Sequence, residues 1–147
     1  SQPELSWELN GAPPATNEAP QFLKHGDKVF IIYSASGCWT DEYSLGLLSA
    51  SASADLLNPA TWTKSPQPVF VKNPTALAFG TGHNSFFKSA DGTEDWIMYH
   101  ANASSGQGCD DERSARIQKF TWKADGTPDF GLPAAVGAAL DNPAGEN

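Results

Sequence analysis

Two short stretches of the sequence carry side chains that could take part in chemistry. In Asn17-Glu18-Ala19-Pro20, a lone carboxylate stands just before a run with strand character. In Gly80-Thr81-Gly82-His83-Asn84, two glycines lead a histidine and an asparagine into another strand. A carboxyl group can transfer a proton, and an imidazole can transfer a proton or bind a metal. A structural histidine and a solvated glutamate are the ordinary alternatives for these two positions.

The elements that position these residues are expected to be β-strands. His83 opens a hairpin that turns at Asp91-Gly92 and returns over residues 95–100. Glu18 precedes residues 21–24, which are expected to pair with residues 28–34. Further strands are predicted over residues 5–9, 43–50 and 115–123, and either a turn or one helical turn over residues 55–62 before another short strand.

The pattern as a whole predicts an all-β fold, because segments with helical periodicity are almost missing. A hairpin followed by a further strand occurs twice, and each unit spans several tens of residues. That is the size of a four-stranded propeller blade. β-Sandwich and jelly-roll folds give similar patterns, so the periodicity leaves these three architectures open.

Composition narrows the class of protein. The 147 residues are 18% charged and 39% hydrophobic, which suits one soluble globular unit or part of one. The net charge of −8 argues against nucleic acid or an anionic membrane as partner and suits a secreted protein with a neutral substrate. No apolar run approaches membrane-spanning length. The chain starts at Ser1 without a Met or a signal sequence, so we expect a processed, nicked or engineered end.

The two cysteines, Cys38 and Cys109, both lie in glycine-containing loops. They can form one disulfide or remain two free thiols, and their spacing is not that of metal ligands. A disulfide is favoured because other features indicate secretion. One such feature is Asn102-Ala103-Ser104, a sequon for N-glycosylation.

The order and spacing of five short motifs resemble those of glycoside hydrolase family 43. The motifs are Asn17-Glu18-Ala19-Pro20, Tyr33-Ser34-Ala35, Gly80-Thr81-Gly82-His83-Asn84-Ser85, Trp96-Ile97-Met98-Tyr99-His100-Ala101, and Arg116-Ile117-Gln118 with Trp122-Lys123-Ala124-Asp125-Gly126-Thr127-Pro128. The resemblance runs from Leu5 to about Gly131. It is greatest to the secreted arabinofuranosidases that trim arabinan or arabinoxylan, with β-xylosidases of the same family as the alternative.

This resemblance implies a five-bladed β-propeller with the active site at its central axis. Residues 1–147 are then the C-terminal part of one catalytic domain, supplying about two to three blades. The family inverts configuration with an Asp base, a tuning Asp and a Glu acid. The Glu of the family's Glu-Gly-Pro motif falls on Glu18, with Ala19 in place of the glycine. Both Asp residues belong to the first two blades and have no matching motif here.

An acid without a base cannot carry out inverting hydrolysis, which needs two carboxyl groups roughly 6.5–9.5 Å apart. We therefore expect the N-terminal part of the enzyme on another polypeptide, with activity only when both parts associate. The expected reaction is release of L-arabinofuranose from arabinan or arabinoxylan side chains, outside the cell. A noncatalytic carbohydrate-binding β-domain is the alternative from a different class.

The resemblance also suggests further site residues. His83 falls on the family's axial histidine, near an ion commonly assigned as calcium. Because calcium prefers oxygen ligands, His83 would act through water. An arginine following His100, either Arg113 or Arg116, would reach the sugar or the acid. A surface ion pair with a neighbouring acidic residue is the alternative for either arginine.

The remaining aromatic residues and histidines are assigned by their local context. Trp39, beside Cys38, is a candidate platform for stacking a sugar ring. The other four tryptophans are expected to be core residues, as aromatics in strands usually are; they are Trp7, Trp62, Trp96 and Trp122. His100 is expected in the core at a strand end and His25 in a solvated turn.

Overall fold

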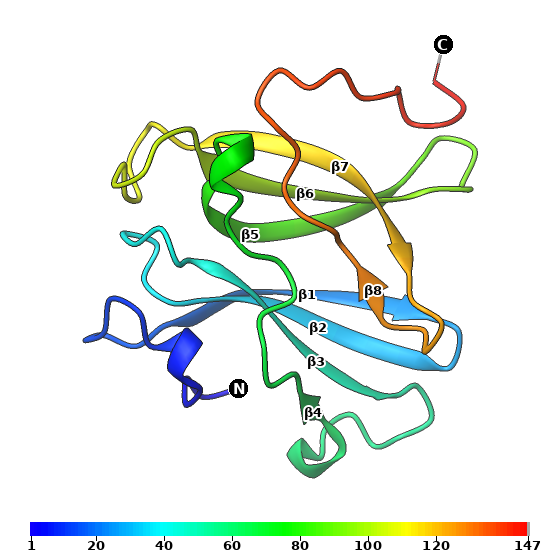
Figure 1. Ribbon diagram of the computed structural model, residues 1–147. Helices are drawn as coiled ribbons and strands as arrows, with labels where there is room; N and C mark the ends of the chain where they lie inside the picture. The colour runs from blue at the N-terminus through cyan, green and yellow to red at the C-terminus, as the bar shows by residue number, and fades with distance from the viewer. Residues whose placement is uncertain (147) are drawn as a thin grey trace.

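Two antiparallel sheets of four strands make up the computed structural model, which describes residues 1–146 (Figure 1). Within each sheet, every strand pairs with the next one along the chain. The first sheet consists of β1 (Asn17–His25), β2 (Lys28–Ala35), β3 (Ser44–Ser51) and β4 (Thr63–Lys64). The second consists of β5 (Phe79–Lys88), β6 (Asp95–Asn102), β7 (Ser114–Trp122) and β8 (Pro128–Asp129). The all-β prediction is therefore confirmed.

Helical structure in residues 1–146 is limited to three short 3-10 turns. They are η1 (Ser6–Glu8), η2 (Pro59–Thr61) and η3 (Pro74–Ala76). Within this described part, no helix is long and apolar enough to cross a membrane. The helical turn predicted before β4 is confirmed by η2. The strand predicted over residues 5–9 is wrong, because the Glu8 carboxylate accepts hydrogen bonds from the backbone N–H groups of Glu4 and Leu5 and closes a turn.

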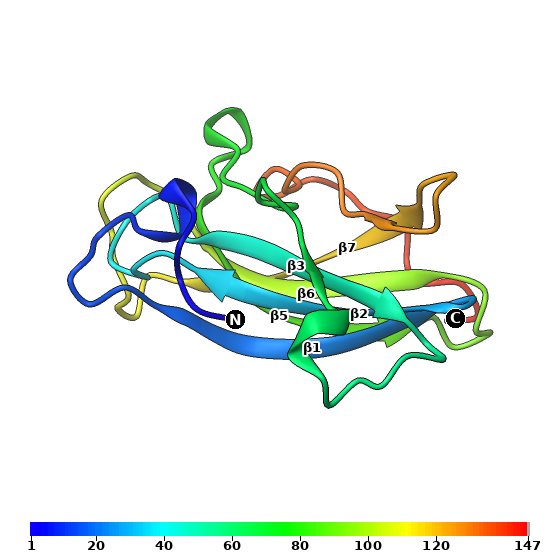
Figure 2. The ribbon, with the colours of Figure 1, turned by 90° about the horizontal axis from the view of Figure 1, so that it is seen from below.

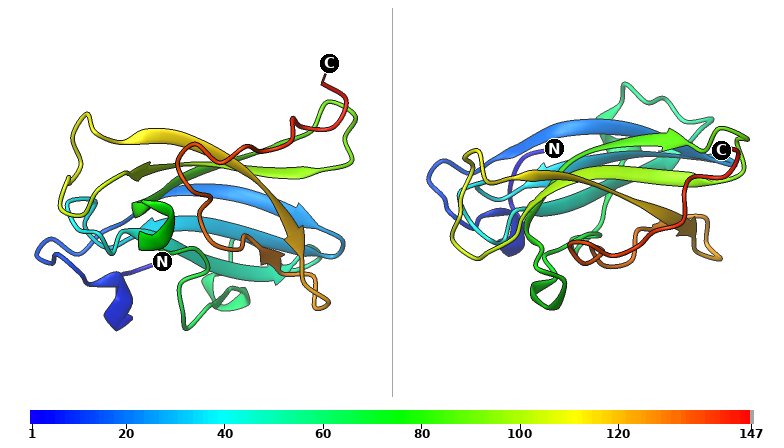
Figure 3. Two further views of the ribbon diagram at one scale, coloured as in Figure 1. Left: turned by 45° about the horizontal axis from the view of Figure 1, so that its top comes forward. Right: turned by 90° about the horizontal axis from the view of Figure 1, so that it is seen from above.

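The sheets lie one over the other, and β5 packs against the strands of the first sheet (Figures 2 and 3). Their facing sides form one core that combines alternate residues of both sheets with residues of the connections. It contains Phe30, Ile32, Leu45, Leu47, Phe70, Ala78, Ile97, Tyr99, Ala101, Phe120 and Phe130. Of the four tryptophans predicted as core, only Trp96 is fully buried, while Trp122 packs against the core and Trp7 and Trp62 are half-buried.

Each sheet also carries apolar side chains on the face away from the other sheet. On the first sheet, Phe22 pairs with Ile31, and Ile31 pairs with Leu48. Phe22 is 58% exposed, and on the second sheet Met98, which pairs with Ile117, is 42% exposed. Within residues 1–146, the two sheets thus bury one face each and leave apolar groups on the other.

Loops from both sheets are joined at one end of the molecule, drawn on the left of Figure 1. Cys38 of the β2–β3 loop and Cys109 of the β6–β7 loop form a disulfide, which confirms the favoured prediction. The same loops are linked again by the Asp41 carboxylate, which accepts hydrogen bonds from the Ser105 hydroxyl and the Gly106 N–H. The connection between the sheets is therefore fixed covalently and by hydrogen bonds beside the start of β1.

The sequon is not accessible in the folded chain. Asn102 is 2% exposed, and its Nδ2 donates to the carbonyl of Gly108 at 2.8 Å. The nitrogen that glycosylation would modify is therefore buried and engaged, so the sequon gives no support for secretion.

Candidate active site

Glu18 lies at the second position of β1, where the pairing with β2 is interrupted. Glu18 pairs with Ser34, and the regular register resumes only at Gln21. Between them Ala19 adopts a left-handed conformation with φ of 49°, and Pro20 has no N–H to donate. This bulge re-aims the strand just after Glu18, as bulges beside functional residues often do. A left-handed alanine costs free energy, so its presence marks a position where the local geometry is imposed by its surroundings.

The Glu18 carboxylate is held by one phenol. Tyr43 Oη donates a hydrogen bond to Glu18 Oε1 at 2.6 Å. Burial raises the pKa of the Tyr43 phenol, and its hydrogen bond to Glu18 raises it further. The phenol therefore keeps its proton across the working pH range of proteins and acts as a donor.

The Tyr43 ring can reach Glu18 because residue 82 has no side chain. A Cβ atom at Gly82 would lie 2.2 Å from Tyr43 Cε1, a distance at which the ring would have to move. The ring also stacks on the imidazole of His100, the residue that pairs with Gly82, with centroids 5.5 Å apart and planes 5° from parallel. The second glycine of the Gly-x-Gly motif thus serves the packing of Tyr43, a role that the sequence did not reveal.

Next to this pair lies a hollow of about 540 Å³ lined by His83, His100, Asp110, Asp111, Arg113 and Ala115. Arg113 Nη1 lies 3.4 Å from His100 Nε2. Burial, then the charge of Arg113 and the proximity of His83, together lower the pKa of His100 to about 4. His100 is therefore neutral near pH 7, and it belongs to the wall of this hollow more than to the core predicted for it.

His83 is exposed at this hollow and also stands in a left-handed conformation, with φ of 53°. Its backbone N–H donates to Ser34 Oγ at 2.7 Å, which ties the bulge of β5 to the strand that pairs with Glu18. Residues 1–146 contain no group of three or more His, Cys, Asp or Glu that could hold a metal ion. The two imidazoles, His83 and His100, are not the oxygen ligands that calcium prefers. This chain alone does not fit a calcium ion.

The two candidate arginines have different surroundings. Arg113 lies beside His100 in the hollow described above. Arg116 Nη2 instead donates to the carbonyl of Leu77 at 2.8 Å and to that of Asn102 at 3.4 Å. The alternative of surface ion pairs is not observed for either, because the ion pairs found within residues 1–146 all use lysine. The structure brings Arg113, and not Arg116, together with the residues around Glu18.

Trp39 lies in the disulfide-closed loop with an exposed ring. It is 46% exposed, and it packs on Gly37 and Gly11, where added Cβ atoms would lie 2.4 Å and 2.7 Å from ring atoms. The glycines form a floor that holds one side of the indole, so an aromatic surface is available to a ligand. His25, at the far end of β1, is exposed as predicted but stacks on Trp122 at 3.9 Å.

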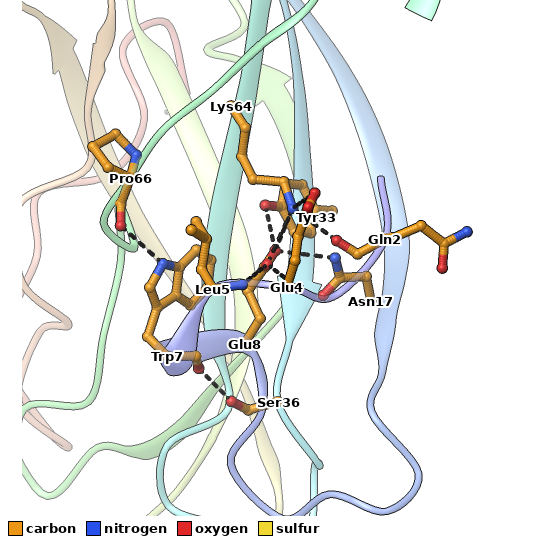
Figure 4. Close-up of polar contacts among 10 residues, drawn as sticks. All are labelled: Gln2, Glu4, Leu5, Trp7, Glu8, Asn17, Tyr33, Ser36, Lys64 and Pro66. Atoms are coloured by element: carbon orange, nitrogen blue, oxygen red, sulfur yellow. Dashed lines mark hydrogen bonds and ion pairs between the residues drawn. The ribbon is translucent and has the colours of Figure 1, made fainter.

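One carboxylate was missed by the sequence reasoning. Glu8 is fully buried, and its two oxygens accept hydrogen bonds from five groups (Figure 4). The donors are the N–H groups of Glu4 and Leu5 at 2.9 Å, Asn17 Nδ2 at 3.0 Å, Tyr33 Oη at 2.8 Å and Lys64 Nζ at 3.0 Å. Burial would raise the pKa of Glu8, but the hydrogen bonds from the backbone, Lys64 and Tyr33 lower it to about 2.

Glu8 acts on the site through Asn17, the residue directly before Glu18. A glutamate three residues after the start of a helical turn is a capping signal when serine or threonine precedes it. Here Leu5 occupies that position, so the familiar pattern is absent. The spacing between Leu5 and Glu8 was the only available signal.

Comparison with known proteins places the chain in a family. The model of glycosyl hydrolases family 43 matches residues 2–128. An extracellular exo-alpha-(1->5)-L-arabinofuranosidase from Streptomyces avermitilis is 52% identical over 142 residues, covering 93% of this chain and 29% of that protein. Alpha-L-arabinofuranosidase 43 from Humicola insolens is 44% identical, with the same two coverages.

Solved structures agree with the sequence matches. An alpha-L-arabinofuranosidase from Lactobacillus brevis superposes with a TM-score of 0.87 at 37% identity, covering 95% of this chain and 43% of that one. A thermostable family-43 glycoside hydrolase gives a TM-score of 0.79 at 28% identity, covering 99% of this chain and 44% of that one. The chain thus spans less than a third of the curated relatives' length and under half of these solved structures. From the match along nearly its whole length, this chain belongs to glycoside hydrolase family 43.

Proposed function

We propose that this chain is the C-terminal part of a five-bladed β-propeller in which its two sheets are two blades. The apolar faces that the sheets turn away from each other support this proposal, because each would pack against a neighbouring blade. The remaining blades would come from the part of the catalytic domain that this chain does not cover. They would also bring the base and the tuning Asp.

The proposed reaction is inverting hydrolysis that releases L-arabinofuranose from arabinan or arabinoxylan, in an extracellular enzyme. Glu18 is the proposed general acid, which protonates the oxygen of the leaving group while a base on another blade activates a water. One observation carries this assignment. Glu18 stands at a strained bulge and lines a hollow of about 280 Å³ together with Asn17 and Tyr33. Among the described residues, only its Oε1 accepts a hydrogen bond. Its other oxygen is thus available to a substrate.

The neighbours of Glu18 receive supporting roles. Arg113 would bind a sugar hydroxyl or the charge of the acid, and Trp39 would stack on a sugar ring at the mouth of the site. Because Arg116 is engaged by two carbonyls, we propose Arg113 for the binding role in its place. Any calcium ion near His83 would need its oxygen ligands from water or from the other blades, and no step of the reaction depends on it here.

Changing Glu18 to Gln in the complete domain tests the proposed acid. Loss of the acid slows general acid catalysis by about 10²–10⁴-fold. The loss should be largest for aryl arabinofuranosides with a poor leaving group, since a good leaving group departs without protonation. Glu42→Gln is the control, because Glu42 is an exposed carboxylate that pairs with Lys72 on the surface. Full activity of Glu18→Gln on the poor leaving group would refute the assignment.

Two alternative functions can be distinguished by the substrate that the protein prefers and by whether the chain is stable alone. A β-xylosidase of the same family would hydrolyse aryl xylosides faster than aryl arabinofuranosides. A noncatalytic sugar-binding domain would be a stable monomer that binds arabinan by itself. Size-exclusion chromatography and urea unfolding of this chain alone would show whether it is a stable monomer, as a binding domain requires, or whether it needs the remaining blades.

A further inference from the structure

We infer that Tyr43 is a positioning residue that occupies Oε1 of Glu18 and thereby leaves the transferable proton on Oε2. The inference rests on the proposed function of Glu18 as general acid. It assigns different roles to the two carboxyl oxygens, and it gives Tyr43 a role in the reaction in addition to packing.

The hydrogen bond between the two residues is short and has a defined direction. Tyr43 Oη and Glu18 Oε1 are 2.6 Å apart, a distance typical of a hydroxyl that donates to a carboxylate. A proton on Oε1 would compete with the phenol proton for the same space. The proton of the neutral acid is therefore favoured on Oε2. Within residues 1–146, no hydrogen bond to Oε2 is found, so this oxygen is free to meet a leaving group.

The phenol itself has little freedom to move away. Tyr43 is 1% exposed, and its ring lies against the backbone of Gly82 and stacks on the imidazole of His100, the residue that pairs with Gly82. Its loop is tied to the second sheet by the disulfide between Cys38 and Cys109. A donor with a fixed position acts on the same carboxyl oxygen in every turnover.

Other ionisable groups surround the pair, and they set the background against which Tyr43 acts. His83, His100, Arg113, Asp110 and Asp111 line a hollow that the pair reaches through the contact of Tyr43 with His100. A second hollow, of about 280 Å³, is lined by Glu18 itself with Asn17, Tyr33 and Ser1, and behind Asn17 lie Glu8 and Lys64. A change confined to the Tyr43 hydroxyl leaves all of these charges in place.

Tyr43→Phe in the complete domain removes the donor and keeps the ring. A hydrogen bond to a charged acceptor stabilises the ionised acid, so without it Glu18 holds its proton to higher pH. We expect the alkaline limb of the pH–rate profile to move up by about one pH unit. For a poor leaving group kcat should fall about tenfold, with KM changed less than about threefold, while a good leaving group should be nearly unaffected.

Tyr33→Phe is the matched control. It removes the same hydroxyl from the other tyrosine–glutamate pair, in which Tyr33 donates to Glu8. This variant should lower the unfolding temperature without moving the alkaline limb. Replacing Tyr43 with 3,5-difluorotyrosine provides a second test that preserves the ring and its packing. The more acidic phenol donates more strongly, so the limb should move to lower pH, opposite to Tyr43→Phe.

The outcomes separate the inference from the function on which it rests. If Glu18→Gln loses activity on the poor leaving group but both Tyr43 variants keep the native limb and kcat, the positioning role is overturned and the acid assignment stands. An equal loss on good and poor leaving groups in both Tyr43 variants would also overturn it, since that is the result of a structural defect. If Glu18→Gln keeps full activity, both proposals fail together.

Discussion

Glu8 and Glu18 lie in similar local arrangements, but the Glu8 carboxylate accepts many more hydrogen bonds than the Glu18 carboxylate. Each accepts a hydrogen bond from a tyrosine 25 residues further along the chain. Glu8 is fully buried and accepts from four further groups, whereas Glu18 is half-buried and has one donor. A carboxylate surrounded by donors is fixed as a charge and cannot give a proton near neutral pH. The comparison shows how a single unused oxygen distinguishes a carboxylate suited to chemistry from one that stabilises the fold.

The two tyrosines that donate to these glutamates each pack against a glycine. Tyr33 lies against Gly46, where a Cβ atom would be 2.4 Å from Tyr33 Cζ, and Tyr43 lies against Gly82 at 2.2 Å. Neither glycine is among those with a left-handed backbone, so the missing side chain is what each position requires. A glycine thus leaves room for a tyrosine ring in two places, once beside the buried Glu8 and once beside the proposed acid.

The largest effect that should separate the two carboxylates is on stability. Glu8→Gln removes the charge from a buried network and takes from the Lys64 ammonium, whose side chain is 17% exposed, its buried partner, leaving it the exposed carboxylate of Glu4. We expect the free energy of unfolding to fall by about 3 kcal/mol at pH 7. Glu18→Gln should change it by less than about 1 kcal/mol, because an amide oxygen can still accept from Tyr43. Urea unfolding of both variants gives these values directly.

Urea unfolding at acid pH tests whether the stabilisation by Glu8 is lost as the pH falls. The pKa of Glu8 is lowered to about 2 from an ordinary value of 4.5, so its stabilisation is complete above pH 4.5 and is lost as the pH falls toward 2. Glu8→Gln should flatten the stability curve in that window. A variant that loses stability with the native slope between pH 4.5 and 2 would show that another group carries the effect.

The next effect compares the two glycines. Gly46→Ala and Gly82→Ala each force a tyrosine ring to move, which costs about 1–3 kcal/mol of stability in well-packed sites. Gly82→Ala should in addition reduce kcat more than about tenfold, since it displaces Tyr43 from Glu18. Gly46→Ala should leave kcat within about twofold at temperatures where the domain is folded. Equal losses of activity in the two variants would break the proposed distinction.

A smaller effect concerns His100, which lies against Tyr43. Burial lowers the pKa of His100 from 6.5 to about 4, so the unfolded chain binds more protons between these values and stability falls as the pH falls through them. His100→Phe keeps an aromatic ring against Tyr43 and removes the titration. We expect the native domain, but not this variant, to lose about 1–2 kcal/mol between about pH 6.5 and 4.5. Above pH 4.5 the stabilisation by Glu8 is still complete, so the two effects occupy separate windows.

The sequence predicted the strands well because their signals are local. The continuous apolar run within residues 28–34 and the hairpin around Asp91-Gly92 both rest on neighbours within a few positions. The motif order also led to Glu18 and His83, and the resemblance suggested Arg113 or Arg116. The fold places His83 and Arg113 on one hollow, and Glu18 is linked to the wall of that hollow through Tyr43 and His100. Tyr43 could not be found in this way, because its contact with Glu18 depends on the packing of Gly82 from the other sheet.

Glu8 and Asn102 are two positions where a local sequence pattern predicts the wrong environment for the side chain. A glutamate near the start of the chain has the composition of a surface residue, and its burial becomes possible only when donors from η1, β1, β2 and β4 converge on it. The sequon at Asn102 is a local pattern whose accessibility is decided by the β6–β7 loop. In both cases long-range contacts reverse what the local residues suggest.

The smallest expected effect tests the bulge that aims Glu18. Ala19 has φ of 49°, a conformation that costs an L-residue about 1–2 kcal/mol and glycine almost nothing. Glycine also has more freedom to lose on folding, about 0.5–1 kcal/mol, so Ala19→Gly should stabilise the domain by up to about 1 kcal/mol, as measured by urea unfolding. The control is Ala52→Gly, at a half-buried turn position outside the left-handed region, which should destabilise the domain slightly. If Ala19→Gly also lowers kcat, then the strained alanine holds the Glu18 carboxylate in place, and the backbone strain contributes to catalysis.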